Sequence, residues 1–224
     1  MKHQVMIIED DDELAHSLSV LLDSAGMTDV IRFDSPAQFL LALPSLSEVM
    51  NEPGCVLLDI RLPDMSGAAL YAHLQSLAFS WPVIFMTGHG DLSMAVDLMK
   101  AGAFDYVTKP FDPMGLIERI KAANMLSSTQ LMDHRFKQDH KGKLASLTPH
   151  EIQVFTRILR NQTTREIAEA MENSTRTIET HRANLFKKMG ASTALEMAQE
   201  QERFVRLGGV MPFSMTPSDA QSTP

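Results

Sequence analysis

The sequence has almost none of the features that build secreted or membrane-spanning proteins. Its 224 residues include one cysteine, Cys55, which excludes an internal disulfide and fits a reducing compartment. No apolar run approaches the roughly 20 residues that a membrane-spanning helix needs, and no signal-peptide pattern precedes the first strand-like run, residues 5–8. Because 44% of the residues are hydrophobic and 21% are charged, we expect a globular cytoplasmic protein without a membrane partner.

Positive charge is scarce in the first half of the chain. Residues 1–125 contain 7 Lys and Arg against 17 Asp and Glu, whereas residues 141–206 contain 11 against 8. An acidic region is suited to cations, and a mildly basic region is suited to phosphate groups. The asymmetry predicts two modules with different partners, although so small a basic surplus does not identify nucleic acid by itself.

Residues 1–125 alternate between strand-like and helix-like patterns. Five strand-forming runs alternate with five helical segments, which predicts a doubly wound parallel α/β sheet of five strands. In such sheets ligands collect at the carboxyl ends of the strands. Polar residues stand at or just past four of these ends, namely Glu9 with Asp10, Asp59, Thr87 and Lys109. We therefore expect them to converge on one edge of the sheet.

Four segments of this region carry a family resemblance. They are IIEDD (7–11), LLDIRLPDMSG (57–67), FMTGHG (85–90) and DYVTKPF (105–111). Together they resemble the receiver domain of two-component response regulators, which has a flavodoxin-like sheet. The resemblance implies that Asp59 accepts a phosphoryl group from a partner histidine kinase, and that the protein is a phosphoacceptor rather than an enzyme with its own substrate.

Phosphoryl transfer to Asp59 requires charge neutralisation by a hard cation. Glu9, Asp10 and Asp59 offer the carboxylate oxygens that Mg²⁺ prefers, and the resemblance adds the backbone carbonyl of Arg61. The acidic run leaves a shift of one residue open, to Asp10 and Asp11. We favour Glu9 and Asp10, because that register places the following helix with its apolar residues inward.

The resemblance also assigns roles around the phosphoryl group. It implies that Lys109 neutralises a phosphoryl oxygen, that Thr87 hydrogen-bonds the group, and that Tyr106 is the switch aromatic that moves inward. A half-buried tyrosine on an edge strand would look the same in the sequence, so both interpretations of Tyr106 stay open.

Residues 144–207 have a different pattern, made of short helices. Capping boxes begin two of them, at Thr148 and Thr163. A third helix, predicted over residues 177–189, has a buried stripe formed by Ile178, Leu185 and Met189. This arrangement predicts an all-α helix-turn-helix domain. Residues 126–143 lack clean periodicity and are predicted to be a helix tail and a polar linker, and residues 208–224 are predicted to be disordered.

The short helices also resemble a known family. The segments LTPHE (147–151), REIA (165–168) and TIETHRANLFKKM (177–189) resemble the LuxR-type output domain of NarL/LuxR/FixJ regulators. The resemblance implies binding to duplex DNA by a homodimer, with a fourth helix carrying Leu195, Ala198 and Val205 for dimerisation, and RNA polymerase as a further candidate partner. The predicted DNA contacts are Thr175, Arg176, Thr177, Glu179, Thr180, Arg182, Ala183, Asn184, Lys187 and Lys188.

Both halves together predict a phosphorylation-controlled transcriptional regulator. Two alternatives stay open. The first is a phosphotransfer enzyme with an aspartate nucleophile, which would leave residues 147–207 unexplained. The second is a regulator whose output domain binds protein or RNA. Kinase activity is excluded because the sequence contains no ATP-binding motif.

Overall fold

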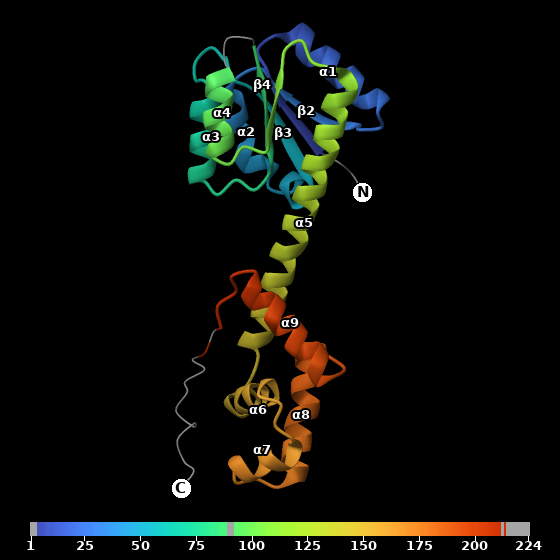
Figure 1. Cartoon of the computed structure of the whole chain (residues 1–224), viewed down its shortest axis with the longest axis vertical. Helices are drawn as coiled ribbons and strands as arrows, with labels where there is room; N and C mark the ends of the chain where they lie inside the picture. Colours follow the sequence, from blue (N-terminus) through green and yellow to red (C-terminus); the bar gives the residue numbers. More distant parts are fainter. Residues whose placement is uncertain (1–3, 89–91, 212, 214–224) are drawn as a thin grey trace. The chain divides into compact units, whose positions relative to one another are not determined.

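The chain folds into two compact units. The computed structural model describes residues 4–88, 92–211 and 213, and the units comprise Met1–Met132 and Asp133–Pro224. The division falls inside a single 33-residue helix, α5 (Pro113–Ala145), which Figure 1 draws without a break. None of the described helices is long and apolar enough to cross a bilayer.

The first unit is built on a five-stranded parallel sheet. Its strands are β1 (Gln4–Ile8), β2 (Asp29–Phe33), β3 (Gly54–Asp59), β4 (Val83–Thr87) and β5 (Asp105–Thr108). The spatial order is β2-β1-β3-β4-β5 with every pairing parallel. This is the flavodoxin-like order, so the predicted fold class is confirmed.

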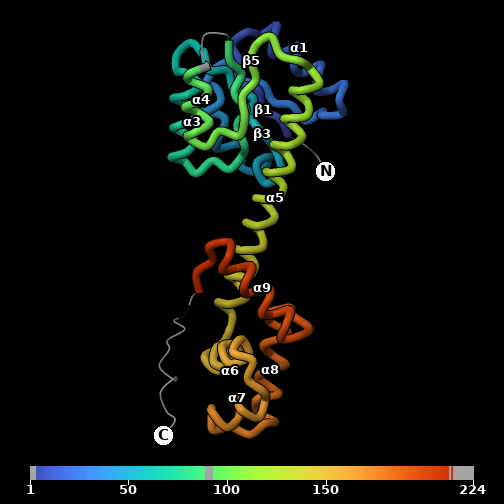
Figure 2. Tube along the Cα trace, viewed as in Figure 1, coloured from blue at the N-terminus to red at the C-terminus, as the bar shows by residue number. Residues whose placement is uncertain are grey.

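Helices cover both faces of the sheet, as Figure 2 shows. One face packs against α2 (Pro36–Ala42), α3 (Gly67–Ser76) and α4 (Leu92–Lys100), and the other against α1 (Asp12–Ser24) and α5. Alternate strand residues point to opposite faces. Ile8 and Leu58 therefore join the first cluster, whereas Ile7 and Leu57 join the second. Burial on both faces explains why these strands are continuously apolar.

Polar residues begin the helices of this unit. Asp11 caps α1 by accepting from the backbone N–H groups of Glu13 and Leu14, and Ser35 caps α2, whose first residue is Pro36. The segment between α2 and β3 contains short 3₁₀ turns, η1 (Leu43–Leu46) and η2 (Val49–Asn51).

The predicted polar linker is instead helical, because α5 continues through residues 126–143 to Ala145. Its buried positions follow one helical phase up to Ser127 and another from Phe136 through His140 to Leu144. A single periodic stripe therefore does not exist along α5, which is why the sequence looks irregular there.

The second unit contains α6 (Pro149–Leu159), α7 (Thr164–Ala170), α8 (Thr175–Met189) and α9 (Ala194–Arg206) around one apolar core. Both predicted capping boxes are present, at Thr148 and Thr163. The stripe Ile178, Leu185 and Met189 is fully buried, as predicted. Ser174 caps α8, so that this helix begins two residues before the predicted start.

The start of the predicted disordered tail is packed against the second unit. Gly209 N–H donates to the Phe204 carbonyl at 2.8 Å, and a Cβ at Gly209 would clash with the Phe204 ring. Met211 and Phe213 pack against the core of this unit. The prediction of disorder is therefore wrong for residues 208–211 and 213, and the rest of the tail lies outside the described residues.

Candidate functional site

The predicted acidic residues meet at the carboxyl ends of β1 and β3. Asp59 is the last residue of β3 and is only 7% exposed, and Glu9, directly after β1, is 3% exposed. Lys109, just after β5, bridges them, because its Nζ lies 2.6 Å from Asp59 Oδ2 and 2.7 Å from Glu9 Oε2. The second Asp59 oxygen, Oδ1, accepts the backbone N–H of Arg61 at 3.0 Å.

Two buried carboxylates that share one ammonium group make an unusual electrostatic site. Burial raises the pKa of Glu9 to about 7, because the hydrogen bond from Lys109 only partly offsets the burial and the nearby Asp59 charge. For Lys109, burial alone would lower the pKa, but the hydrogen bonds to Asp59 and Glu9 outweigh it and the pKa is raised. Lys109 therefore stays charged at neutral pH, whereas Glu9 is poised to gain or lose a proton.

The carboxylates also fit a divalent cation. One ligand oxygen from each of Glu9, Asp10 and Asp59 lies within 4.8 Å of the others. Asp10 is exposed while the other two are buried, so the group is open to water on one side. An all-oxygen set that leaves room for water suits Mg²⁺. Asp11 is used as the N-cap of α1 and lies outside this group.

Thr87 and Tyr106 lie on the neighbouring strands β4 and β5. Thr87 is fully buried at the end of β4, where its hydroxyl donates to the Gly88 carbonyl at 3.0 Å and its own carbonyl accepts the Lys109 N–H at 2.7 Å. Tyr106 is half-buried and pairs in register with Phe85. The strand order thus brings Thr87 to the same edge as the acids, whereas a switching role for Tyr106 stays a prediction.

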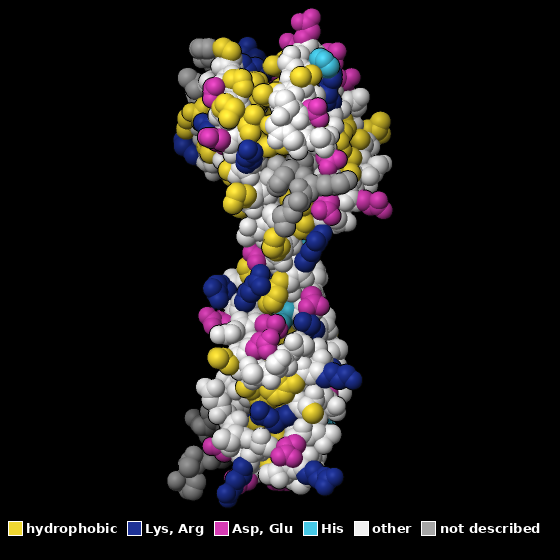
Figure 3. Space-filling model, turned by 90° about the vertical axis from the view of Figure 1, so that its right-hand side faces the viewer, with side chains coloured by type: hydrophobic (Ala, Val, Ile, Leu, Met, Phe, Trp, Pro, Cys, Tyr) yellow, Lys and Arg dark blue, Asp and Glu magenta, His cyan; other side chains and the backbone are white. Residues whose placement is uncertain are grey.

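The helix α8 presents most of the predicted DNA contacts to solvent. Thr175, Arg176, Glu179, Thr180, Ala183, Asn184 and Lys187 are exposed. Thr177 and Arg182 are half-buried; the Thr177 hydroxyl pairs with the capping Ser174 hydroxyl, and the Arg182 guanidinium lies over the Phe186 ring. In the face drawn in Figure 3, Lys and Arg side chains of this unit are interspersed with Asp and Glu rather than gathered into one patch.

Lys188 is turned away from this exposed surface. Its Nζ lies 2.7 Å from Oε2 of Glu151, a residue only 4% exposed, and 3.0 Å from the Ser146 carbonyl. In this structure the charge of Lys188 neutralises a buried glutamate of α6, and its predicted contact with DNA stays a prediction. The i+1 neighbour of an exposed helical residue lies about 100° around the helix, which explains why Lys187 and Lys188 differ.

Both halves of the chain match known protein families. The response regulator receiver domain matches residues 5–121, and the luxR family of bacterial regulatory proteins matches residues 145–200. The transcriptional regulatory protein FixJ of Bradyrhizobium diazoefficiens is 37% identical over 198 residues, 88% of this chain and 94% of that protein. The response regulator protein TodT of Pseudomonas putida is 34% identical over 200 residues, 89% and 85% of the two chains.

A solved structure agrees with these relatives. That of the response regulator StyR, 30% identical, covers 91% of this chain and 100% of its own with a TM-score of 0.80. The chain belongs to the response regulator family. It is a two-component transcriptional regulator, in which a receiver domain implies a histidine kinase partner and a LuxR-type domain implies DNA binding.

Sequence reasoning about this response regulator missed the contribution of Gly67. A Cβ at Gly67, the first residue of α3, would lie 2.0 Å from the backbone oxygen of Asp59. Only glycine lets α3 approach the end of β3 this closely, so Gly67 fixes the backbone that carries Asp59. A glycine directly after the capping Ser66 was the available signal.

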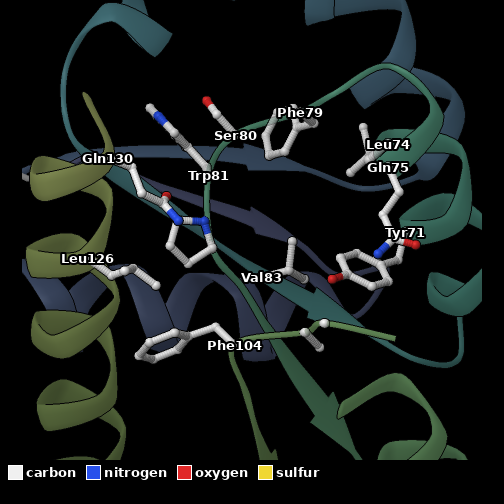
Figure 4. A pocket seen from close by; sticks show the side chains of 13 residues that line it. Tyr71, Leu74, Gln75, Phe79, Ser80, Trp81, Val83, Phe104, Leu126 and Gln130 are labelled. Carbon is white, nitrogen blue, oxygen red and sulfur yellow. The ribbon is translucent and has the colours of Figure 1, made fainter. Parts of the chain in front are cut away.

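A hollow of about 570 Å³ lies at the opposite, amino end of the response regulator's sheet. Figure 4 shows Leu126 and Gln130 of α5 on one side of it, and Tyr71 and Gln75 of α3 on the other. No charged residue lines it within the described part of the chain. It therefore shares neither residues nor chemistry with the acidic site.

Proposed function

We propose that Asp59 is the residue of this regulator that a sensor histidine kinase phosphorylates, and that Glu9, Asp10, Asp59 and the Arg61 carbonyl hold Mg²⁺ for the transfer. The carrying observation is that the buried Asp59 carboxylate lies 2.6 Å from Lys109 Nζ and in one group with two further carboxylates. Bound Mg²⁺ would supply neutralisation of the charge on the transferred phosphoryl group.

The residues around Asp59 have separate tasks in this proposal. An Asp59 oxygen attacks phosphorus and forms an acyl phosphate, while the bond from phosphorus to the donor histidine nitrogen breaks. The Arg61 N–H orients the carboxylate through Oδ1. Lys109 is close enough to exchange Asp59 Oδ2 for a phosphoryl oxygen, and the Thr87 hydroxyl exchanges the Gly88 carbonyl for the same group. Tyr106 then follows the movement of Thr87.

The output half would read duplex DNA with the exposed face of α8. Ala183 and Asn184 are exposed in the middle of this helix, where a small apolar group and an amide can meet base edges.

Leu195 and Val205 of α9 are 67% and 55% exposed, whereas the core contacts of α9 come from Met197 and Phe204. We propose that the exposed pair contacts a second copy, so that two α8 helices meet a two-fold DNA site, with RNA polymerase as a further partner.

Phosphoryl transfer tests the Asp59 proposal. Asp59→Asn is expected to abolish labelling by radiolabelled acetyl phosphate with Mg²⁺, because the amide cannot form the acyl phosphate. Asp64→Asn is the matched control, since Asp64 is exposed on the loop that follows β3, and it should be labelled like the natural protein. Label that persists in Asp59→Asn, or that is lost only in Asp64→Asn, contradicts the assignment.

Two further assays address the alternative functions. Repeated turnover of a small phosphoester by the natural protein would favour a phosphotransfer enzyme over a regulator. A gel-shift series with promoter duplexes at rising salt tests the output domain. Loss of every sequence-specific complex at moderate salt would favour a protein or RNA partner.

A further inference from the structure

A buried histidine joins the end of α5 to α9 in the second unit. His140 is 1% exposed, and its ring lies between those of Phe136 and Phe204, with centroids 5.5 Å and 4.8 Å away. Neither the receiver chemistry nor the DNA-reading face uses this side chain. A buried imidazole needs hydrogen-bond partners for both ring nitrogens, so its surroundings define its protonation state.

One ring nitrogen has a partner that identifies the neutral tautomer. His140 Nε2 lies 3.0 Å from Gln201 Oε1, and the amide nitrogen of Gln201 donates to the Met211 sulfur at 3.0 Å. Because the amide nitrogen is directed to the sulfur, the amide oxygen faces the ring. An oxygen can only accept, so Nε2 carries the proton in the neutral ring and Nδ1 carries the lone pair.

The other ring nitrogen faces a carboxylate. His140 Nδ1 lies 3.9 Å from Glu200 Oε2, and both atoms are buried without a hydrogen-bond partner among the described residues. In the neutral ring, two acceptors therefore face each other across this gap. A proton on Nδ1 makes this nitrogen a donor that faces a carboxylate, and shortening the 3.9 Å gap to hydrogen-bond distance would form a charge-assisted contact. One added proton, together with this shortening, would give both unpartnered atoms a partner.

Two further ion pairs lie on the helices that hold this ring. From α9, Arg203 lies over Phe136 and bonds Asp133 of α5 at 3.0 Å. On α5, Lys143 pairs with Asp139 at 2.8 Å. Among the described residues of the C-terminal segment, Met211 and Phe213 contact this unit and are uncharged. Glu200 is the charged group whose carboxylate oxygen faces His140 Nδ1.

We propose that His140 and Glu200 form a proton-dependent latch, which binds residues 133–145 of α5 to α9 more tightly when His140 is protonated. Because the neutral ring leaves His140 Nδ1 and Glu200 Oε2 without partners among the described residues, the latch tightens when Nδ1 gains a proton. It would regulate how firmly α5 is attached to the helix that carries the exposed Leu195 and Val205. This latch operates without phosphorylation of Asp59.

Nitrogen-15 NMR of the histidine rings in the full-length protein tests the tautomer directly. At alkaline pH His140 should carry its proton on Nε2, and acidification should add a proton to Nδ1. His134, exposed six residues earlier on α5, serves as the solvent-exposed reference in the same spectrum. A neutral His140 ring with the proton on Nδ1, or a ring that stays neutral down to pH 5, overturns the proposal.

Amide hydrogen exchange tests the latch itself. We expect the protection of residues 133–145, corrected for intrinsic exchange, to be on the order of tenfold greater at pH 6 than at pH 8, the size of one hydrogen bond to a charged group. Glu200→Gln should remove this pH dependence, because its amide N–H can face the Nδ1 lone pair at every pH. The control His134→Gln should keep it. Equal protection at both pH values, or unchanged pH dependence in Glu200→Gln, contradicts the latch.

Discussion

Two buried glutamates, one in each unit, lie at the same distance from a lysine, but their pKa values are shifted in opposite directions. Glu9 Oε2 lies 2.7 Å from Lys109 Nζ, and Glu151 Oε2 lies 2.7 Å from Lys188 Nζ. The pKa of Glu9 is raised to about 7. For Glu151, burial would raise the pKa, but the hydrogen bonds from Lys188 and Thr148 outweigh it and the pKa is lowered.

The difference lies in what else surrounds each carboxylate. Glu151 also accepts the Thr148 backbone N–H at 2.8 Å, as part of a complete capping box. Glu9 shares its lysine with Asp59, and its contact with a backbone N–H, that of Asp11, is long at 3.5 Å. A glutamate with several short donors stabilises a fold, whereas one that shares its single short donor with a second carboxylate is prepared for a cation.

Removal of Lys109 should produce the largest effect of the substitutions considered, and it should widen the difference between the environments of Glu9 and Glu151. Lys109→Ala leaves Glu9 and Asp59 buried without their cation, and it removes the group that would neutralise the phosphoryl oxygen. We expect phosphorylation by acetyl phosphate to fall by about a hundredfold or more, the usual loss for a charge-stabilising donor. Lys121→Ala, at an exposed position of α5, is the control. A rate within threefold of the natural protein would contradict the role of Lys109.

Glu151→Gln should remove the interactions by which this glutamate stabilises the second unit. The amide keeps the size of the carboxylate but loses the ion pair with Lys188 and weakens the cap, so the second unit should lose about 1–2 kcal/mol of unfolding free energy. Chemical denaturation of the full chain, followed by probes in each unit, measures this loss. Glu166→Gln alters the exposed capping box of α7 and should have a smaller effect. An equal or larger loss in Glu166→Gln would show that Lys188 adds nothing to Glu151.

The high pKa of Glu9 predicts that protons compete with Mg²⁺. At pH 6 most Glu9 is protonated and at pH 8 most is ionised, so the Mg²⁺ affinity should rise about tenfold between these values. The folded state binds this proton more tightly than the unfolded state, so without Mg²⁺ the contribution of Glu9 to stability is largest below pH 4.5 and is lost as the pH rises through 7. Calorimetric titration with Mg²⁺ at both pH values measures the affinity. Glu9→Gln should flatten its pH dependence, and a flat profile in the natural protein would contradict the prediction.

Much of the acidic site was predictable, and the glutamate partners were not. Parallel strands end at one edge, so the polar residues after β1, β3, β4 and β5 had to converge. The sequence does not reveal that Lys109 bridges Glu9 and Asp59, or that Lys188 contacts Glu151 37 residues away, because these pairs depend on tertiary packing. The continuous α5 was missed because its buried face changes phase, whereas Ser174 was a visible N-cap that would have corrected the start of α8.

Lys187 and Lys188 should separate DNA binding from stability, with the smallest effect of the series. Lys187→Ala removes an exposed charge of α8, so it should weaken binding to all duplexes alike and reduce the salt slope of log affinity by about one. Lys188→Ala removes the partner of Glu151 and should lower the stability of the second unit while leaving the salt slope unchanged. Fluorescence anisotropy at several salt concentrations, below the unfolding temperature of each variant, measures the slope. If Lys188→Ala changed the slope and Lys187→Ala did not, the assignment of Lys188 to Glu151 rather than to DNA would be wrong.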